Sequence, residues 1–129
     1  MAYGLKSYGQ YWILDNDVDV ATVDVTLYDD STEDPGFQDD NESDLNENSN
    51  ISRKNIDIQV FSGGGGTYEF SKSNVDIDTT SVTTDTYVDS YALLDSSSVI
   101  LTGGLTDYTR INITDVGTVT IVEVGGSFL

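Results

Sequence analysis

The feature that most constrains the fold is a period of two in the apolar residues. Val23, Val25 and Leu27 alternate with polar residues, and Ile56 to Val60 repeat the pattern. Because successive side chains of a strand point to opposite faces, this alternation predicts strands with one buried face. About eight short strands are expected, rich in Val, Ile, Thr and Tyr and separated by turn residues, at 18–27, 56–60, 68–70, 75–77, 87–94, 99–101, 111–113 and 119–124.

Two departures from strict alternation carry information. The parity of the apolar residues switches near Ala21–Thr22, which predicts a turn or a bulge at that point. The segment from Tyr87 to Leu94 is apolar on both parities. It is therefore expected to be a central strand that is covered on both faces.

The N-terminal segment has a different period. Leu5, Tyr8 and Trp12 follow helical spacing and share one face, so a helix is expected within residues 1–14, although Gly4 and Gly9 weaken it. This face either docks on a partner, which makes the three residues candidate interface residues, or covers the core of its own domain. The second interpretation is favoured.

These elements predict one mainly β domain over residues 1–129, an antiparallel β-sandwich of jelly-roll-like type with one short N-terminal helix. Residues 29–50 hold 9 acidic residues and no basic one. They are expected to form a long acidic loop, since connections above roughly 12–15 residues are uncommon and are functional or disordered. Its candidate outward-facing residues are Asp39, Asp40, Glu42 and Asp44.

The spacing of Asp39, Asn41 and Ser43 resembles the start of a calcium-binding EF-hand loop. The sixth position, which should be Gly, is Asp44, and the twelfth, which should be Glu, is Asn50. The EF-hand assignment therefore fails, and no specific metal site is expected. A solvated acidic loop is favoured, and loose binding of Na⁺, K⁺ or a divalent ion among Asp39, Asp40, Glu42 and Asp44 is the alternative.

Composition excludes several classes of protein. The chain has no Cys and no His, so disulfide scaffolds, Cys or His zinc sites and His-based catalytic triads are ruled out. Five basic residues against 23 acidic ones cannot form a basic patch for nucleic acid. No apolar run suggests a signal peptide or membrane insertion. Most Asp residues alternate with apolar strand residues and should face water, so no catalytic residues and no cofactor are expected.

The net charge of −18 is spread over the chain and is dominated by Asp, with 18 Asp and 5 Glu. At molar salt the Debye length falls to about 3 Å, which cancels most of the self-repulsion of such a surface. The composition therefore favours a protein that works in very high salt over one that is merely acidic.

The few basic residues are candidates for ion pairs. Arg110 is compatible either with a bridge to a neighbouring subunit, as a candidate interface residue, or with an intrachain pair. Arg53 and Lys54 are expected to pair with the acidic insert.

Several segments resemble a family of small structural proteins from tailed viruses, including those that infect haloarchaea. They are GLKSYGQYWILD at the start, TVDVTLYDDSTEDP before the insert, SYALLDSSSVILTGGL, and TRINITDVGTVTI near the end. Together they cover about half of the chain. A Tyr-Ala-Arg-Gln segment that is typical of the family after its variable loop is represented here only by ISRKN, with Arg53 as its remnant.

The resemblance implies a virion component without catalytic residues: a capsid decoration or turret protein or, as an alternative, a tail or fibre component. Such a protein would sit on the exterior of the particle as a homo-oligomer, a trimer or pentamer, in contact with the major capsid protein or other virion proteins and with a host surface glycan or protein.

Two functions from other classes remain open. An acidic DNA-mimic inhibitor would concentrate its carboxylates on one face, whereas here they follow nearly every strand. A carbohydrate-binding module would stack sugars on exposed tyrosines, for which Tyr3, Tyr8, Tyr11 and Tyr108 are candidates.

Overall fold

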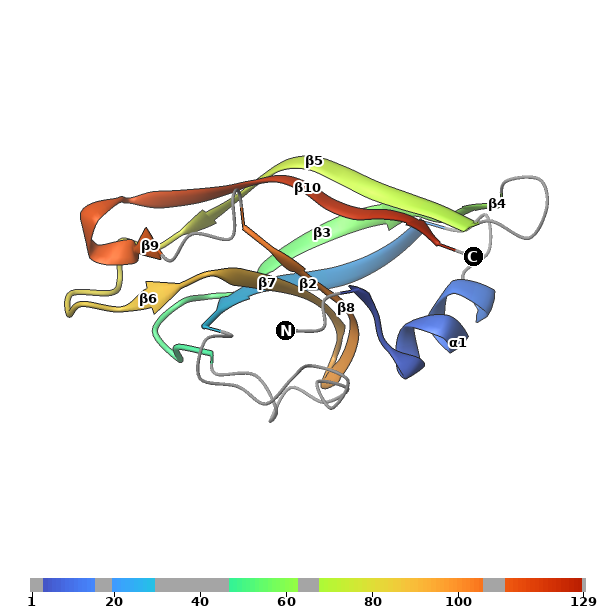
Figure 1. The fold of residues 1–129 in the computed structure, drawn as a ribbon, viewed down its shortest axis with the longest axis horizontal. Coiled ribbons are helices and arrows are strands. Elements are labelled where there is room, and N and C mark those ends of the chain that lie inside the picture. Colours follow the sequence, from blue (N-terminus) through green and yellow to red (C-terminus); the bar gives the residue numbers. More distant parts are fainter. Residues whose placement is uncertain (1–3, 16–19, 30–46, 63–67, 106–110, 129) are drawn as a thin grey trace.

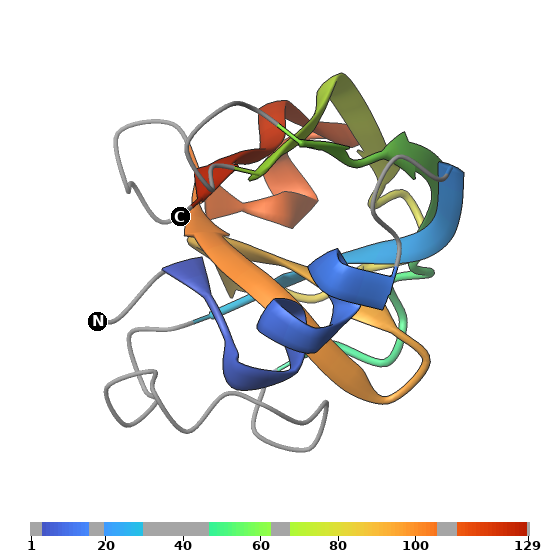
Figure 2. The same ribbon diagram turned by 90° about the vertical axis from the view of Figure 1, so that its right-hand side faces the viewer.

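The computed structural model describes residues 4–15, 20–29, 47–62, 68–105 and 111–128, and it is mainly β with antiparallel sheets. Figures 1 and 2 show a layer made by β5 and β10 lying over a layer that contains β2, β7 and β8. The elements are β1 (Gly4–Leu5), α1 (Ser7–Asp15), β2 (Val20–Tyr28), β3 (Lys54–Gln59), β4 (Phe61–Ser62), β5 (Tyr68–Asp78), β6 (Tyr87–Val88), β7 (Ser90–Asp95), β8 (Ser98–Gly104), β9 (Ile111–Asn112), a 3-10 turn (Ile113–Asp115) and β10 (Thr118–Phe128).

Three antiparallel sheets are present among the described residues. The largest has the strand order β1-β8-β7-β2-β3, the second has the order β10-β5-β4, and β6 pairs with β9. The main core lies between the two larger sheets and takes buried side chains from both, including Val23, Val25 and Leu93 from one and Phe70, Ile77 and Ile121 from the other.

The N-terminal helix is shorter than expected. Gly4 and Leu5 are not helical; they pair as β1 with Thr102 and Leu101 of β8. The helix α1 then lies against β8, at one end of the layers (Figure 1). Gly9 permits this approach, because a Cβ at that position would lie 2.2 Å from the carbonyl oxygen of Ile100. The glycine that weakens helix propensity is therefore required by packing.

The turn or bulge expected at Ala21–Thr22 is absent. β2 is continuous, and its register with β3 runs without a break from Val20 opposite Gln59 to Val25 opposite Lys54. The parity of the apolar residues switches because Val20 is 64% exposed at the start of the strand, not because the backbone turns.

The expected strands at 68–70 and 75–77 are one strand, β5, which pairs along its length with β10. Phe70 is buried on one parity and Val75 on the other, and the buried residues of β10 change parity in the same region. Asn74 has a φ of +54°, a left-handed conformation that Asn tolerates better than most residues. This local change in backbone conformation allows both strands to bury apolar side chains of one parity on one side of Asn74 and of the other parity on the other side.

The segment expected as one central strand changes sheets at Asp89. Tyr87 and Val88 form β6, whereas β7 lies between β2 and β8 in the largest sheet. Asp89 is buried between them, and its backbone donates to the carbonyl of Tyr28 and accepts from Leu105. The expectation of a strand covered on both faces is confirmed for β7, where Ser90 to Leu94 are buried.

A second buried cluster accounts for the double coverage. It consists of Tyr28, Ala92, Leu94 and Val99 and is separate from the main core. Ala92 and Leu94 alternate with Leu93, which belongs to the main core, so the two clusters lie on opposite faces of the sheet. Within the described residues, no helix is long and apolar enough to cross a membrane.

Candidate functional site

The three candidate interface residues of the N-terminal segment do not form one exposed face. Trp12 is 3% exposed and meets Phe70 edge to face, with ring centroids 5.1 Å apart. Leu5 and Tyr8 are partly buried against the same core. The Tyr8 hydroxyl donates to Asp95 Oδ2 over 2.6 Å and so fixes the helix to the β7–β8 hairpin. This packing corresponds to the alternative that the helix covers its own domain.

Several other candidates lie outside the described residues. These are Arg110, the loop residues Asp39, Asp40, Glu42 and Asp44, and the tyrosines Tyr3 and Tyr108; for Tyr11 the backbone is described but not the side chain.

The end of the acidic insert is held by the ion pair that the sequence predicts between the insert and Arg53. Arg53 donates from two nitrogens to the carboxylate of Glu47, with Nε to Oε2 at 3.0 Å and Nη2 to Oε1 at 2.8 Å. Thr26 of β2 donates its hydroxyl to the same carboxylate, and the backbone of Glu47 bridges to Tyr28. The last residues of the insert, from Glu47, are therefore part of the folded domain.

The ionisation of Glu47 follows from these contacts. Burial raises the pKa of Glu47, but the hydrogen bonds from Arg53 and Thr26 and the positive charge of Arg53 outweigh it, and the pKa lies below its ordinary value. Glu47 is thus a structural carboxylate that stays charged beside its partner.

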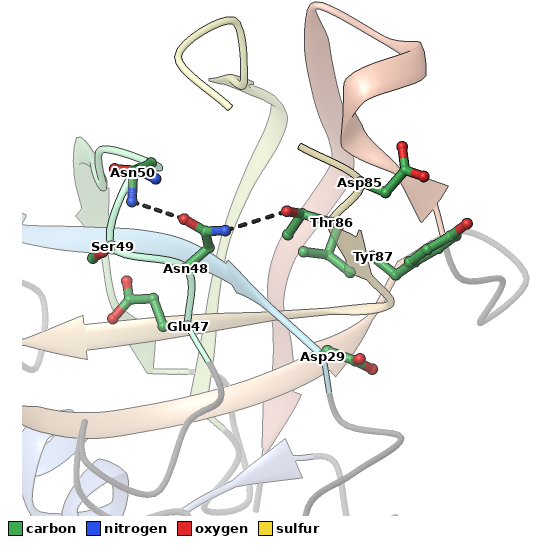
Figure 3. A pocket seen from close by; sticks show the side chains of 9 residues that line it. Asp29, Glu47, Asn48, Ser49, Asn50, Asp85, Thr86 and Tyr87 are labelled. Carbon is green, nitrogen blue, oxygen red and sulfur yellow. Dashed lines mark hydrogen bonds between the residues drawn. The ribbon is translucent and has the colours of Figure 1, made fainter. Parts of the chain in front are cut away.

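A groove of about 560 Å³ opens beside this ion pair (Figure 3). One wall is the end of the insert, and the other is the segment that leads into β6, although 34 residues or more separate them in sequence. The lining residues are Asp29, Glu47, Asn48, Ser49, Asn50, Asp85, Thr86, Tyr87 and Val88.

The two walls are joined by hydrogen bonds. Asn48 donates its side-chain amide to the hydroxyl of Thr86 over 3.3 Å, as the dashed line in Figure 3 shows. The side-chain oxygen of Asn48 accepts from the backbone N–H of Asn50 over 2.8 Å. The amide of Asn48 is therefore fixed in orientation between the walls.

The orientation of the Asp85 carboxylate is also fixed, by hydrogen bonds from the segment that contains β9 and the 3-10 turn. Asn112 donates its amide to Asp85 Oδ1 over 3.1 Å, and the Thr114 hydroxyl donates to the same oxygen over 3.3 Å. The side-chain oxygen of Asn112 accepts from the backbone N–H groups of Thr86 and Thr114 and caps the 3-10 turn. This turn thus positions the Asp85 wall of the groove.

Sequence reasoning missed this groove because no local motif encodes it. Its residues come from three separate segments that only the fold brings together, namely Asp29, residues 47–50 and residues 85–88. In addition, Tyr87 was expected inside a strand covered on both faces. Tyr87 is instead 44% exposed, since β6 leaves the largest sheet. The described residues contain no group of three or more Asp or Glu side chains placed to hold a metal ion.

Carboxylates elsewhere on the sheets are paired with neutral donors across the strands. Thr22 donates to Asp57 over 2.8 Å, and Thr120 of β10 donates to Asp76 of β5 over 2.6 Å. Asn55 likewise donates to Asp24 over 3.0 Å. Such contacts orient the carboxylates without cancelling their charge.

Comparison of the chain with protein-family models, curated proteins and solved structures finds no significant match in any of the three.

Proposed function

We propose that the protein is a non-enzymatic structural component on the exterior of a virion: a capsid decoration or turret subunit of a halophilic tailed virus, which assembles as a homo-oligomer. The resemblance in sequence suggests the class of protein, with a tail or fibre component as the alternative. The observation that carries the assembly is the position of β10 at the edge of its sheet among the strands that the structure describes.

β10 has 11 residues, and among the described strands its only neighbour is β5. Its sequence, TVTIVEVGGSF, carries one charged residue, Glu123, in a chain with a net charge of −18. Natural proteins protect edge strands with charges, proline or bulges, because an unprotected edge pairs with other strands. The first half of β10 has none of these between Thr118 and Val122, and Val122 is 61% exposed. A second copy that approaches this edge therefore meets little charge on β10 itself.

A ring of three or five copies requires a heterologous contact, in which one surface of a subunit meets a different surface of the next. We assign β10 as one of these surfaces. We assign the complementary surface to β3, which lies at one end of the largest sheet and has β2 as its only neighbour among the described strands. The trimer or pentamer would then present the rest of the domain to the capsid protein below and to the host above.

The exposed carboxylates support operation in high salt. Because Asp24, Asp57 and Asp76 have Asn or Thr as partners, their charges add to the repulsion between copies. Molar salt shortens the range of that repulsion to about 3 Å and so permits the contact at β10.

The absence of enzymatic activity is part of the proposal. A carboxylic acid that acts as a general acid needs a raised pKa. In the part of the chain that the structure describes, Glu47 and Asp78 have a pKa below the ordinary value; for Asp78 the cause is donation from the backbone N–H and hydroxyl of Thr80. A lowered pKa is the opposite of what a general acid requires.

We further propose that the two larger sheets constitute a β-sandwich of jelly-roll-like type. The support is the main core, which is shared by the two sheets, and the crossing of the chain from β3 in one sheet to β4 in the other at Val60, as strands do at sandwich corners.

A single substitution on β10 tests the assembly. Val122→Glu places a charge in the centre of the open edge, and Val20→Glu is the matched control because Val20 is 64% exposed on another strand. Light scattering after size exclusion in molar KCl should give a trimer or pentamer for the wild type and Val20→Glu, and a monomer for Val122→Glu. A monomeric wild type, or an unchanged mass for Val122→Glu, would refute the assignment.

A further inference from the structure

We propose that the groove between residues 47–50 and 85–88 binds a neutral saccharide. The inference does not depend on the assembly at β10, because the groove is built from other elements. It rests on the size of the groove, the rigidity of its polar groups, the sign of its charge and one exposed aromatic ring.

The groove has the size of a small-molecule site. Its volume of about 560 Å³ lies within the roughly 300–1,000 Å³ typical of such sites. Its lining combines carboxylates, amides and hydroxyls, which can both donate hydrogen bonds to sugar hydroxyls and accept hydrogen bonds from them.

The polar groups are fixed before a ligand arrives. Asn48 is held by Asn50 and Thr86, and Asp85 is held by Asn112 and Thr114. Both hydrogen bonds to Asp85 end on Oδ1, and no other described residue donates to Oδ2, which is left to accept from a ligand hydroxyl. A ligand therefore meets oriented groups and loses less conformational entropy on binding.

The charge of the groove selects against anions. Asp29 and Asp85 contribute carboxylates, and the positive charge of Arg53 is engaged by Glu47. Phosphates, uronic acids and sialic acids would be repelled. Because the described residues offer no set of three carboxylates for a metal ion, a neutral polyhydroxylated molecule fits this chemistry best.

The exposed ring of Tyr87 completes the argument. Tyr87 and Asp85 both line the groove, and in Figure 3 the ring and the carboxylate extend from the same segment, on the side away from Asn48. An aromatic face packs against the C–H face of a pyranose, and a neighbouring carboxylate binds the hydroxyls at its edge. Tyr87 and Asp85, two residues apart on one segment, supply this combination.

The test uses the full chain in molar KCl and a panel of oligosaccharides. The neutral set contains glucose, galactose, mannose and N-acetylglucosamine oligomers, and the acidic set contains matched uronic acid and sialic acid glycans. Titration calorimetry measures the affinities. Chemical-shift mapping of backbone amides locates the site for the tightest neutral ligand.

Three variants separate stacking from other effects. Tyr87→Ala removes the ring, Tyr87→Phe retains it, and Asp57→Asn is a charge control on β3 outside the groove lining. Circular dichroism verifies the fold of each variant; Tyr87 is 44% exposed, so its truncation leaves the core intact.

The proposal requires that a neutral glycan binds, that shifts concentrate at 47–50 and 85–88, and that Tyr87→Ala weakens binding by at least about tenfold. Tyr87→Phe and Asp57→Asn should bind like the wild type. It is overturned if no neutral glycan binds, if acidic glycans bind more tightly, if the shifts lie elsewhere, or if Tyr87→Ala binds normally. The mass of the Tyr87→Ala oligomer, which should equal that of the wild type, distinguishes failure of this site from failure of the assembly.

Discussion

The packing of the only tryptophan gives a quantitative test of how the N-terminal helix acts. Trp12 is 3% exposed and forms an edge-to-face pair with Phe70 of β5. Removal of a buried Trp side chain costs about 3–5 kcal/mol, of which the aromatic pair contributes roughly 0.5–1.5 kcal/mol. Trp12→Ala should therefore remove a large part of a total stability of about 5–15 kcal/mol.

The corresponding thermal shift follows from chain length. An unfolding entropy of about 2.1 cal/mol/K per residue gives about 270 cal/mol/K for 129 residues, so Tm should fall by about 11–18 °C. The assay is thermal and urea unfolding in molar KCl, followed by far-UV circular dichroism because the substitution removes the only indole.

Two further variants calibrate the result. Val20→Ala, at a position 64% exposed, should change stability by less than about 0.5 kcal/mol. Trp12→Phe keeps a ring beside Phe70 and should lose less than Trp12→Ala. The reasoning is refuted if Trp12→Ala unfolds within about 1 kcal/mol of the wild type, and a loss of oligomer mass without a loss of stability would make Trp12 an interface residue.

Two other predictions concern the ion pair and the helix. Glu47→Gln should lower the free energy of unfolding by about 1–2 kcal/mol at neutral pH. Because the folded-state pKa of Glu47 lies below its ordinary 4.5, this loss of stability should be present above pH 4.5 and should disappear as the pH falls through the lowered pKa. Urea unfolding at several pH values measures the difference. A constant difference at all pH values would contradict it. In an exposed helix, Gly9→Ala would stabilise the protein by about 1 kcal/mol. Here it should destabilise the protein by about 1–3 kcal/mol, because the new Cβ would overlap the Ile100 carbonyl oxygen. A higher urea midpoint for the variant would show that the helix does not pack closely against β8.

The sequence predicted secondary structure correctly where the buried residues follow the alternation of apolar and polar side chains. The period of two predicted a mainly β chain. The apolar residues on both parities of 87–94 predicted a strand covered on both faces, which is confirmed for residues 90–94, whose side chains enter two separate clusters. The ion pair of Arg53 with the insert was predictable for another reason: few cations face many carboxylates.

The errors arise where the chain leaves a regular pattern. Alternation cannot distinguish two strands from one strand that changes parity, as β5 does near Asn74. It also cannot show that a strand changes sheets at Asp89, and this change exposes Tyr87 and creates one wall of the groove. Helical spacing predicted that Leu5, Tyr8 and Trp12 share one face, but whether that face is exposed or buried depends on tertiary packing.

The dependence of oligomer mass and secondary structure on salt decides whether the wild-type protein is a halophilic homo-oligomer. Size exclusion with light scattering and circular dichroism should be run in molar KCl and in dilute buffer. A halophilic homo-oligomer should be a folded trimer or pentamer in molar KCl and should dissociate or unfold in dilute buffer, since the net charge of −18 is then unscreened. A stable monomer whose mass and spectrum do not depend on salt would contradict the proposal.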